Sequence, residues 1–147
     1  MLGSAVVANV PQPLTGRCLC GAVTYSVNAA PIAQAVCHCT ECQRQTSSPF
    51  SVVVGVPKDD FTVSGDTLTS FETTAEDHGG KTERNFCSAC GSPLFSLSPA
   101  APDFVFIKAG SLDDSSWLEP RLEVWTRSAQ PWSPRLAGAV QMERGPQ

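Results

Sequence analysis

Short runs of apolar residues, many of them alternating with polar residues, recur along the chain and are separated by glycine and proline. Alternation with a period of two is typical of β-strands that bury one face. No stretch of ten or more residues repeats its apolar positions with the spacing of a helix, and 11 Gly and 12 Pro interrupt the chain throughout. The pattern therefore predicts an all-β protein. The expected strands span residues 22–27, 50–56, 61–63, 68–71, 94–95, 104–107 and 122–125.

The expected strands all lie between residues 15 and 132, which predicts a single domain over 15–132. A chain of 147 residues that is 41% hydrophobic is long enough to bury one core. Residues 1–14 and 133–147 lack a regular pattern, so we expect a flexible N-terminal tail and a C-terminal tail. The polar stretch 73–81 is predicted to be a loop.

Charge and the N-terminal sequence exclude several classes of partner. The formal charge is -4 and the 10 Lys and Arg are scattered, which predicts that the protein binds no nucleic acid. Residues 1–8 have no basic segment, and their apolar stretch is far shorter than the roughly 18 residues that a membrane span needs. We therefore expect no signal peptide, no membrane association and a cytoplasmic location.

Three of the seven cysteines, Cys37, Cys39 and Cys42, lie within six residues. Side chains at positions 37 and 39 share one face of an extended chain, and a turn over Thr40 and Glu41 can bring Cys42 to the same point. An odd number of cysteines in such spacing favours metal ligation in a reducing compartment over a disulfide framework. Three protein ligands leave one position of a tetrahedral zinc site open, as in catalytic zinc sites.

The other four cysteines form two pairs in distant segments, C-x-C at Cys18 and Cys20 and C-x-x-C at Cys87 and Cys90. Together they supply the four thiolates of a closed structural zinc site. Two zinc ions per chain are therefore expected. Other divisions of the ligands between the two sites stay open. His78 could be the fourth ligand of the three-cysteine site, or cysteines of the two sets could exchange between the sites. His38 is expected to point away from its neighbouring cysteines and to be exposed or hydrogen-bonded.

Gln43, Arg44 and Ser48 directly follow the three-cysteine motif and are candidate substrate contacts, because an arginine can bind a carboxylate with two hydrogen bonds. A solvent-facing turn is the alternative for these residues. A zinc ion with an open position also makes a thiol acidic, so the sequence favours a small thiol as the ligand. A second zinc with only a structural role is the alternative.

Several motifs together resemble the glutathione-dependent formaldehyde-activating enzyme family, which includes centromere protein V. The resemblance runs from Gly16 to about Trp132. Its motifs are G-x-C-x-C-G from Gly16, C-H-C-x-x-C-x-R over Cys37 to Arg44, S-P-F over Ser48 to Phe50, F-C-x-x-C-G-x-P-L over Phe86 to Leu94, A-G-S-L-D-D over Ala109 to Asp114, and P-W at Pro131 and Trp132.

The resemblance implies a β-tent fold of small antiparallel sheets around zinc sites. It also implies a structural zinc on Cys18, Cys20, Cys87 and Cys90, and a labile catalytic zinc on Cys37, Cys39 and Cys42. The implied activity is a carbon–sulfur lyase or synthase reaction such as formation of S-hydroxymethylglutathione from glutathione and formaldehyde.

This chain departs from the family pattern at Ser47, where relatives commonly carry glycine. A side chain at this position could narrow the approach of a ligand to the backbone. The alternative function is a non-catalytic zinc module that binds a protein partner, for which Trp117, Trp125 and Trp132 are candidate surface residues.

Overall fold

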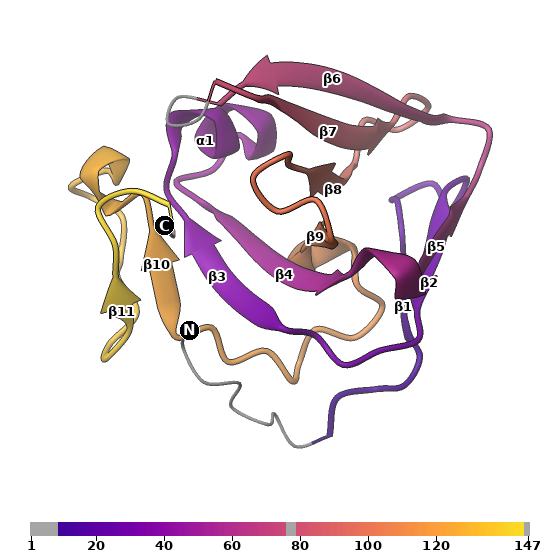
Figure 1. The fold of residues 1–147 in the computed structure, drawn as a ribbon, viewed down its shortest axis with the longest axis horizontal. Coiled ribbons are helices and arrows are strands. Elements are labelled where there is room, and N and C mark those ends of the chain that lie inside the picture. Colours follow the sequence, from indigo (N-terminus) through magenta and orange to yellow (C-terminus); the bar gives the residue numbers. More distant parts are fainter. Residues whose placement is uncertain (1–8, 76–78, 146–147) are drawn as a thin grey trace.

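The computed structural model describes residues 9–75 and 79–145, and its strands form two sheets (Figure 1). The smaller sheet has three strands in the order β1-β2-β5. These strands are β1 (Leu14–Arg17), β2 (Thr24–Val27) and β5 (Phe61–Ser64). All three pair antiparallel, in agreement with the predicted all-β class.

The larger sheet has eight strands in the order β11-β10-β3-β4-β9-β8-β7-β6. Its strands are β3 (Ala33–Cys37), β4 (Ser51–Pro57), β6 (Leu68–Thr74), β7 (Lys81–Cys87), β8 (Pro93–Leu97), β9 (Phe104–Lys108), β10 (Leu122–Val124) and β11 (Val140–Gln141). The helical segments are α1 (Thr40–Thr46) and the 3-10 turns η1 (Lys58–Asp60), η2 (Ala109–Ser111) and η3 (Thr126–Ser128). No helix in the described parts of the chain is long and apolar enough to cross a membrane.

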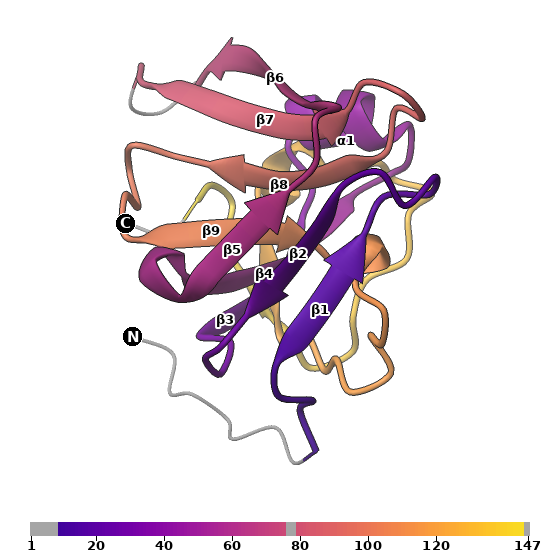
Figure 2. The ribbon, with the colours of Figure 1, turned by 90° about the vertical axis from the view of Figure 1, so that its right-hand side faces the viewer.

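The small sheet lies against the large one, and the core fills the space between them (Figure 2). Alternate side chains of β2, β4 and β9 point into this core, as their period-two patterns predict. The Phe61 ring of the small sheet contacts Phe95 of the large sheet edge to face, with ring centroids 4.9 Å apart. Burial of these apolar side chains is what holds the two sheets together.

A second link joins β1 to the turn after β9. Gly16 forms a bridge with Leu112, and the amide of Asp113 donates to the carbonyl of Thr15 at 2.9 Å. A Cβ atom at Gly16 would lie 2.2 Å from the Tyr25 ring and 2.5 Å from the Ser111 carbonyl. Glycine is therefore required here, and it fixes the A-G-S-L-D-D segment beside the first cysteine pair.

Two local features differ from the sequence-based expectations. Residues 40–46 form the helix α1, where only a turn over Thr40 and Glu41 is expected. The loop expected over 73–81 is shorter at both ends, because β6 extends to Thr74 and β7 starts at Lys81. The residues 76–78, including His78, lie outside the described part of the chain.

The segment 133–147, expected to be a tail, contains β11. Strand β11 pairs parallel with β10, and β10 pairs parallel with β3. The amide of Met142 continues this pairing by donating to the carbonyl of Glu123 at 2.9 Å. The large sheet is therefore mixed at this end, and the C-terminal segment covers the outer side of β10 (Figure 1).

Candidate metal centres and the cavity between them

The side chains of Cys37, Cys39 and Cys42 converge, and their sulfur atoms lie within 4.8 Å of one another. Cys37 ends β3, Cys39 is the N-cap of α1, and Cys42 lies one turn into the helix. The Cys39 sulfur accepts a hydrogen bond from the Cys42 amide at 3.3 Å. The change from strand to helix between these residues therefore builds the three-cysteine cluster that the spacing predicts.

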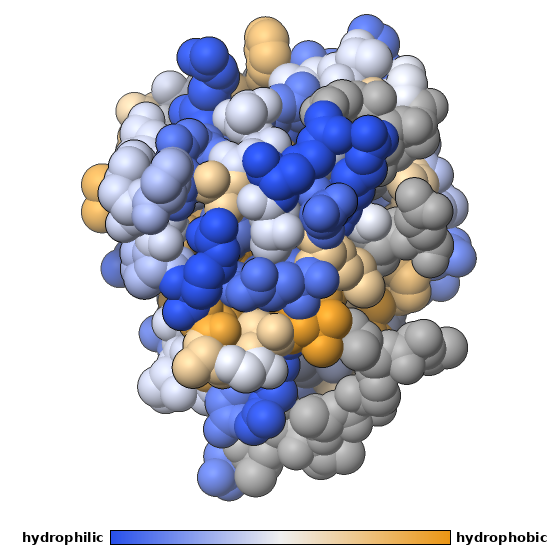
Figure 3. Space-filling view, turned by 90° about the vertical axis from the view of Figure 1, so that its left-hand side faces the viewer, coloured by the Kyte–Doolittle hydropathy of each residue, from blue (hydrophilic) through white to orange (hydrophobic). Residues whose placement is uncertain are grey.

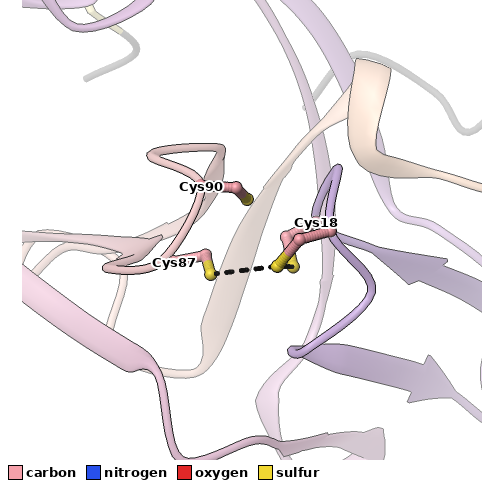
Figure 4. Close-up of side chains that lie close together, drawn as sticks. Cys18, Cys87 and Cys90 are labelled. Atoms are coloured by element: carbon pink, nitrogen blue, oxygen red, sulfur yellow. Dashed lines mark hydrogen bonds between the residues drawn. The ribbon is translucent and has the colours of Figure 1, made fainter.

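The second group consists of Cys18, Cys20, Cys87 and Cys90, whose sulfur atoms also lie within 4.8 Å of one another. Figure 4 shows Cys87, the last residue of β7, and Cys90, which follows it, facing Cys18, which follows β1. The sulfur of Cys20 lies 3.6 Å from that of Cys18 and 3.8 Å from that of Cys87. Thiolates about 2.3 Å from a tetrahedral zinc ion are about 3.8 Å apart, so this donor set fits zinc.

Hydroxyl groups support the anionic form of the four-cysteine cluster. The Thr67 hydroxyl lies 3.2 Å from the Cys87 sulfur, and this hydrogen bond lowers the pKa of Cys87. The Ser92 hydroxyl lies 3.2 Å from the Cys90 sulfur and lowers the pKa of Cys90 to about 5. A metal ligand must be deprotonated, so these contacts favour metal binding.

Two buried cationic side chains lie close to the three-cysteine cluster. The Arg84 guanidinium contacts the Glu41 carboxylate at 2.8 Å, the Gln45 amide oxygen at 3.3 Å and the Cys42 sulfur at 3.9 Å. The Lys108 ammonium donates to the Ser51 hydroxyl at 3.1 Å. Hydrogen bonds from the other two thiols lower the pKa of Cys42, and the positive charges of Lys108 and Arg84 add to this shift.

A cavity of about 830 Å³ is lined by Cys18 of the four-cysteine cluster and by Ser51, which pairs with Cys37 across the sheet; Cys37, Cys39 and Cys42 themselves do not line it. Cys18 and Ser92 line it beside the four-cysteine cluster, whereas Ser48 and Ser51, which follow α1, line it beside the three-cysteine cluster. The A-G-S-L-D-D segment and the adjacent Lys108 form another wall. Arg17, Lys108 and Asp113 give this cavity both positive and negative groups.

The three predicted substrate contacts have different surroundings. Gln43 is engaged by the protein itself, since its side-chain amide donates to the carbonyls of His38 at 2.7 Å and Ser128 at 2.9 Å. Its oxygen accepts from Gln130 at 2.9 Å. Arg44 is exposed and does not line the cavity. Ser48 lines the cavity, so the structure brings only Ser48 to its wall.

Arg84, Lys108 and Arg17 are site residues that the sequence analysis does not identify. Arg84 and Lys108 each occupy one position in a strand, where an isolated cationic residue gives no recognisable motif. Arg17 stands directly before Cys18 in the first cysteine motif. Proximity to the cysteine motif could have indicated Arg17, and adjacency to the A-G-S-L-D-D motif could have indicated Lys108.

His38 is fully buried and faces away from the cysteines on either side of it. Its Nε2 atom lies 2.9 Å from a carboxylate oxygen of Glu123, which is also buried. The predicted hydrogen-bonded alternative for His38 is therefore confirmed. This pair connects the backbone between two cysteines to β10.

The three tryptophans differ in their environments. Trp117 belongs to the core, whereas the Trp132 side chain is 70% exposed. Figure 3 views the side of the molecule that bears β10 and β11, and its described part is mostly hydrophilic, with small, interspersed hydrophobic groups. This face therefore gives no support to an extended apolar docking surface.

Comparison with known proteins agrees with this site. Residues 13–128 match the model of the family described as glutathione-dependent formaldehyde-activating enzyme. Three relatives are each named "Putative glutathione-dependent formaldehyde-activating enzyme". The Talaromyces marneffei relative is 32% identical over 95 residues, which are 63% of this chain and 49% of that protein. The Podospora anserina relative is 27% identical over 137 residues, which are 86% of this chain and 61% of that protein.

The third relative, from Halomonas elongata, is 29% identical over 103 residues, which are 68% of this chain and 66% of that protein. The matched regions thus span about half to two thirds of the length of these relatives. A crystal structure of a Rhodobacter sphaeroides protein superimposes with a TM-score of 0.55 at 21% identity. It covers 73% of this chain and 92% of the other, and it shows the fold alone.

Proposed function

The chain belongs to the glutathione-dependent formaldehyde-activating enzyme family, and on this premise we propose that it is a zinc-dependent carbon–sulfur lyase or synthase. The reaction adds a small thiol to a small aldehyde and reverses that addition. Formation of S-hydroxymethylglutathione from glutathione and formaldehyde is the example that the family description suggests. The observation that carries the proposal is the convergence of Cys37, Cys39 and Cys42, with Cys37 paired to Ser51 in the wall of the cavity.

The two cysteine clusters would have different roles. The four-cysteine cluster would hold a structural zinc, because four thiolates complete a tetrahedral site. The three-cysteine cluster would hold a zinc ion that binds an incoming thiol as a thiolate near neutral pH. Arg84 would fix the helix that carries Cys42, because it joins Glu41 and Gln45 of that helix to β7.

The charges of the cavity suit glutathione, which has two carboxylates, one ammonium group and one thiol. Arg17 and Lys108 would favour the carboxylates, and Asp113 would favour the ammonium group. Ser48 would accept a hydrogen bond from the ammonium group, because its own hydroxyl proton is donated to the Phe50 carbonyl. We retain Gln43 and Arg44 as predicted substrate contacts, with less support, because Gln43 is engaged by protein groups and Arg44 lies outside the cavity wall.

The proposal can be tested by exchange NMR with ¹³C-labelled formaldehyde and glutathione at equilibrium. Magnetisation transfer between free formaldehyde and S-hydroxymethylglutathione gives the rate of exchange, and samples without protein give the spontaneous rate. We expect zinc-loaded wild-type protein to exceed the spontaneous rate at least about tenfold, by holding thiolate and aldehyde in reacting geometry. The Cys42→Ser variant should return to the spontaneous rate. Equal rates with and without wild-type protein, for glutathione and for other small thiols, would contradict the proposal.

A further inference from the structure

Lys108 ends β9 with an ammonium group that is almost fully buried, the residue being 6% exposed. Its hydrogen-bond acceptor is the Ser51 hydroxyl at 3.1 Å. A lysine ammonium has three N–H donors, so one acceptor leaves two of them available. Among the described residues, no carboxylate lies within ion-pair distance of Lys108. A buried cation without a carboxylate partner is costly, and such a group suits a site that receives an anion.

The strand pairing places Lys108 on the same face of the sheet as the three-cysteine cluster. Cys37 of β3 lies opposite Ser51 of β4, and Val53 of β4 lies opposite Lys108 of β9. Paired residues point to the same face, and so do residues two apart in one strand. Cys37, Ser51 and Lys108 therefore project from one face, with Ser51 between the other two.

Lys108 and Ser51 also line the cavity that borders this cluster. The Lys108 ammonium therefore stands in the cavity wall, on the same sheet face as Cys37. Arg84 cannot serve in the same way, because its guanidinium is already paired with Glu41 at 2.8 Å.

We infer that Lys108 is a catalytic residue of the proposed reaction, and that it donates a hydrogen bond to the oxygen that becomes negative when the thiolate attacks the aldehyde. This inference rests on the proposed function. In the step, the thiolate sulfur gives an electron pair to the aldehyde carbon and a C–S bond forms. The π electrons of the C=O bond move to the oxygen, which becomes an alkoxide. Solvent water then protonates the alkoxide, balancing the proton that the thiol released to solvent.

Stabilisation of a developing oxyanion by a fixed donor in a buried site is a large contribution to catalysis, commonly a factor of about 100 or more. Lys108 meets the requirement for a fixed donor because Ser51 orients it and its side chain is buried on the face of the large sheet that also carries Cys37. The reverse reaction uses the same contact, since the alkoxide must form before the C–S bond breaks. The chemical class that this site recognises is therefore a thiol adduct with an anionic oxygen two or three bonds from sulfur.

Two thiols of similar size can show whether Lys108 binds an anionic oxygen near the sulfur or affects the binding of every thiol equally. Thioglycolate has a carboxylate next to its thiol-bearing carbon, and ethanethiol has a methyl group there. We would load the protein with cobalt(II) and follow the thiolate-to-cobalt absorption during titration with each thiol. Wild-type protein should bind thioglycolate more tightly than ethanethiol. Lys108→Met should reduce that preference about tenfold or more, because a charged hydrogen bond is lost.

Lys58→Met is the matched control, because Lys58 is exposed in η1 and does not line the cavity. It should keep the wild-type preference. Ser51→Ala leaves the ammonium in place and removes the acceptor that orients it, so it should reduce the preference by a smaller factor. If Lys108→Met does not fold, the thioglycolate preference of Ser51→Ala tests the role of Lys108 instead.

Three results would overturn the inference. The first is an unchanged preference in Lys108→Met, or in Ser51→Ala if Lys108→Met does not fold. The second is a loss of glutathione binding in Lys108→Met with no change for the two short thiols, because Lys108 would then bind a distant carboxylate of glutathione. The third is no response of wild-type protein to any thiol, in which case the proposed function fails as well. In the expected case, Lys108→Met also lowers kcat for glutathione and formaldehyde at full metal content.

Discussion

Removal of the Glu123 carboxylate should destabilise the protein and release its C-terminal segment. This carboxylate is 1% exposed and accepts three hydrogen bonds. They come from His38 at 2.9 Å, from the Gln141 side chain at 3.1 Å and from the Leu136 amide at 3.4 Å. Glu123→Ala would leave all three donors without this acceptor, and His38 is itself fully buried.

The magnitude follows from these contacts. A hydrogen bond to a charged group contributes about 1.5 to 3 kcal/mol, and a buried donor left without its acceptor costs about 1 to 3 kcal/mol. The Leu136 contact is long and the Gln141 side chain can reach solvent, so both contribute less than the His38 contact. We expect Glu123→Ala to lower the free energy of unfolding by about 3 to 5 kcal/mol. Glu123→Gln keeps the shape and one acceptor and should cost about 1 to 3 kcal/mol.

Urea unfolding followed by tryptophan fluorescence measures this loss, and amide hydrogen exchange locates it. The backbone amides of Val140 and Met142 donate to the backbone carbonyls of Arg121 and Glu123. Both amides should exchange faster in the variant, because the C-terminal segment is released more often. Glu119→Ala is the matched control, because Glu119 forms an exposed ion pair with Arg121 and should change stability by less than about 1 kcal/mol. A loss below about 1 kcal/mol in Glu123→Ala, with unchanged exchange at 140 and 142, would refute the reasoning.

Two further predictions concern the cysteine clusters and α1. Cys87→Ser should yield unfolded or insoluble protein, because it opens the four-cysteine cluster. Cys42→Ser should stay folded and should retain one zinc ion by metal analysis. If both variants unfold to the same extent, both clusters have a structural role. Ser47 ends α1 with a φ of 50°, a left-handed conformation that glycine adopts more readily. Ser47→Gly should therefore raise Tm by about 2 to 4 °C in calorimetry, which corresponds to roughly 1 kcal/mol, and an unchanged or lower Tm would contradict this assignment.

The strands could be predicted from the sequence where one face of the strand is buried. In β2, for example, Tyr25 and Val27 are buried and alternate with more exposed positions, which produces the period-two pattern. The helix α1 has no apolar stripe, because Cys42 is its only buried residue. Contacts from Arg84 to Glu41 and Gln45 stabilise this helix from outside, and no local pattern records such contacts. Strand β11 was missed because it has two residues, both exposed, and its pairing with β10 is a long-range contact.

The two cysteine clusters could be predicted because the spacing of cysteines along the chain reflects the geometry of metal ligation. Both groups, one of four cysteines and one of three, assemble as the sequence indicates. The residues that surround them could not be predicted in the same way. Arg84 and Lys108 reach the three-cysteine cluster only after β7 and β9 pair with strands distant in sequence. The assignment of Gln43 to a substrate has little support for a similar reason, since its partners Ser128 and Gln130 come from the far end of the chain.

The most direct test of the account is whether a small thiol binds through sulfur at Cys37, Cys39 and Cys42. Cobalt(II) replaces zinc, and glutathione, cysteine and other small thiols are titrated while the thiolate-to-cobalt absorption is recorded. The account predicts that the absorption rises on addition of a thiol and saturates at one equivalent bound per chain, because three cysteines leave one tetrahedral position. Cys42→Ser should abolish this change. An absorption spectrum of the wild-type protein that no thiol alters would contradict the account.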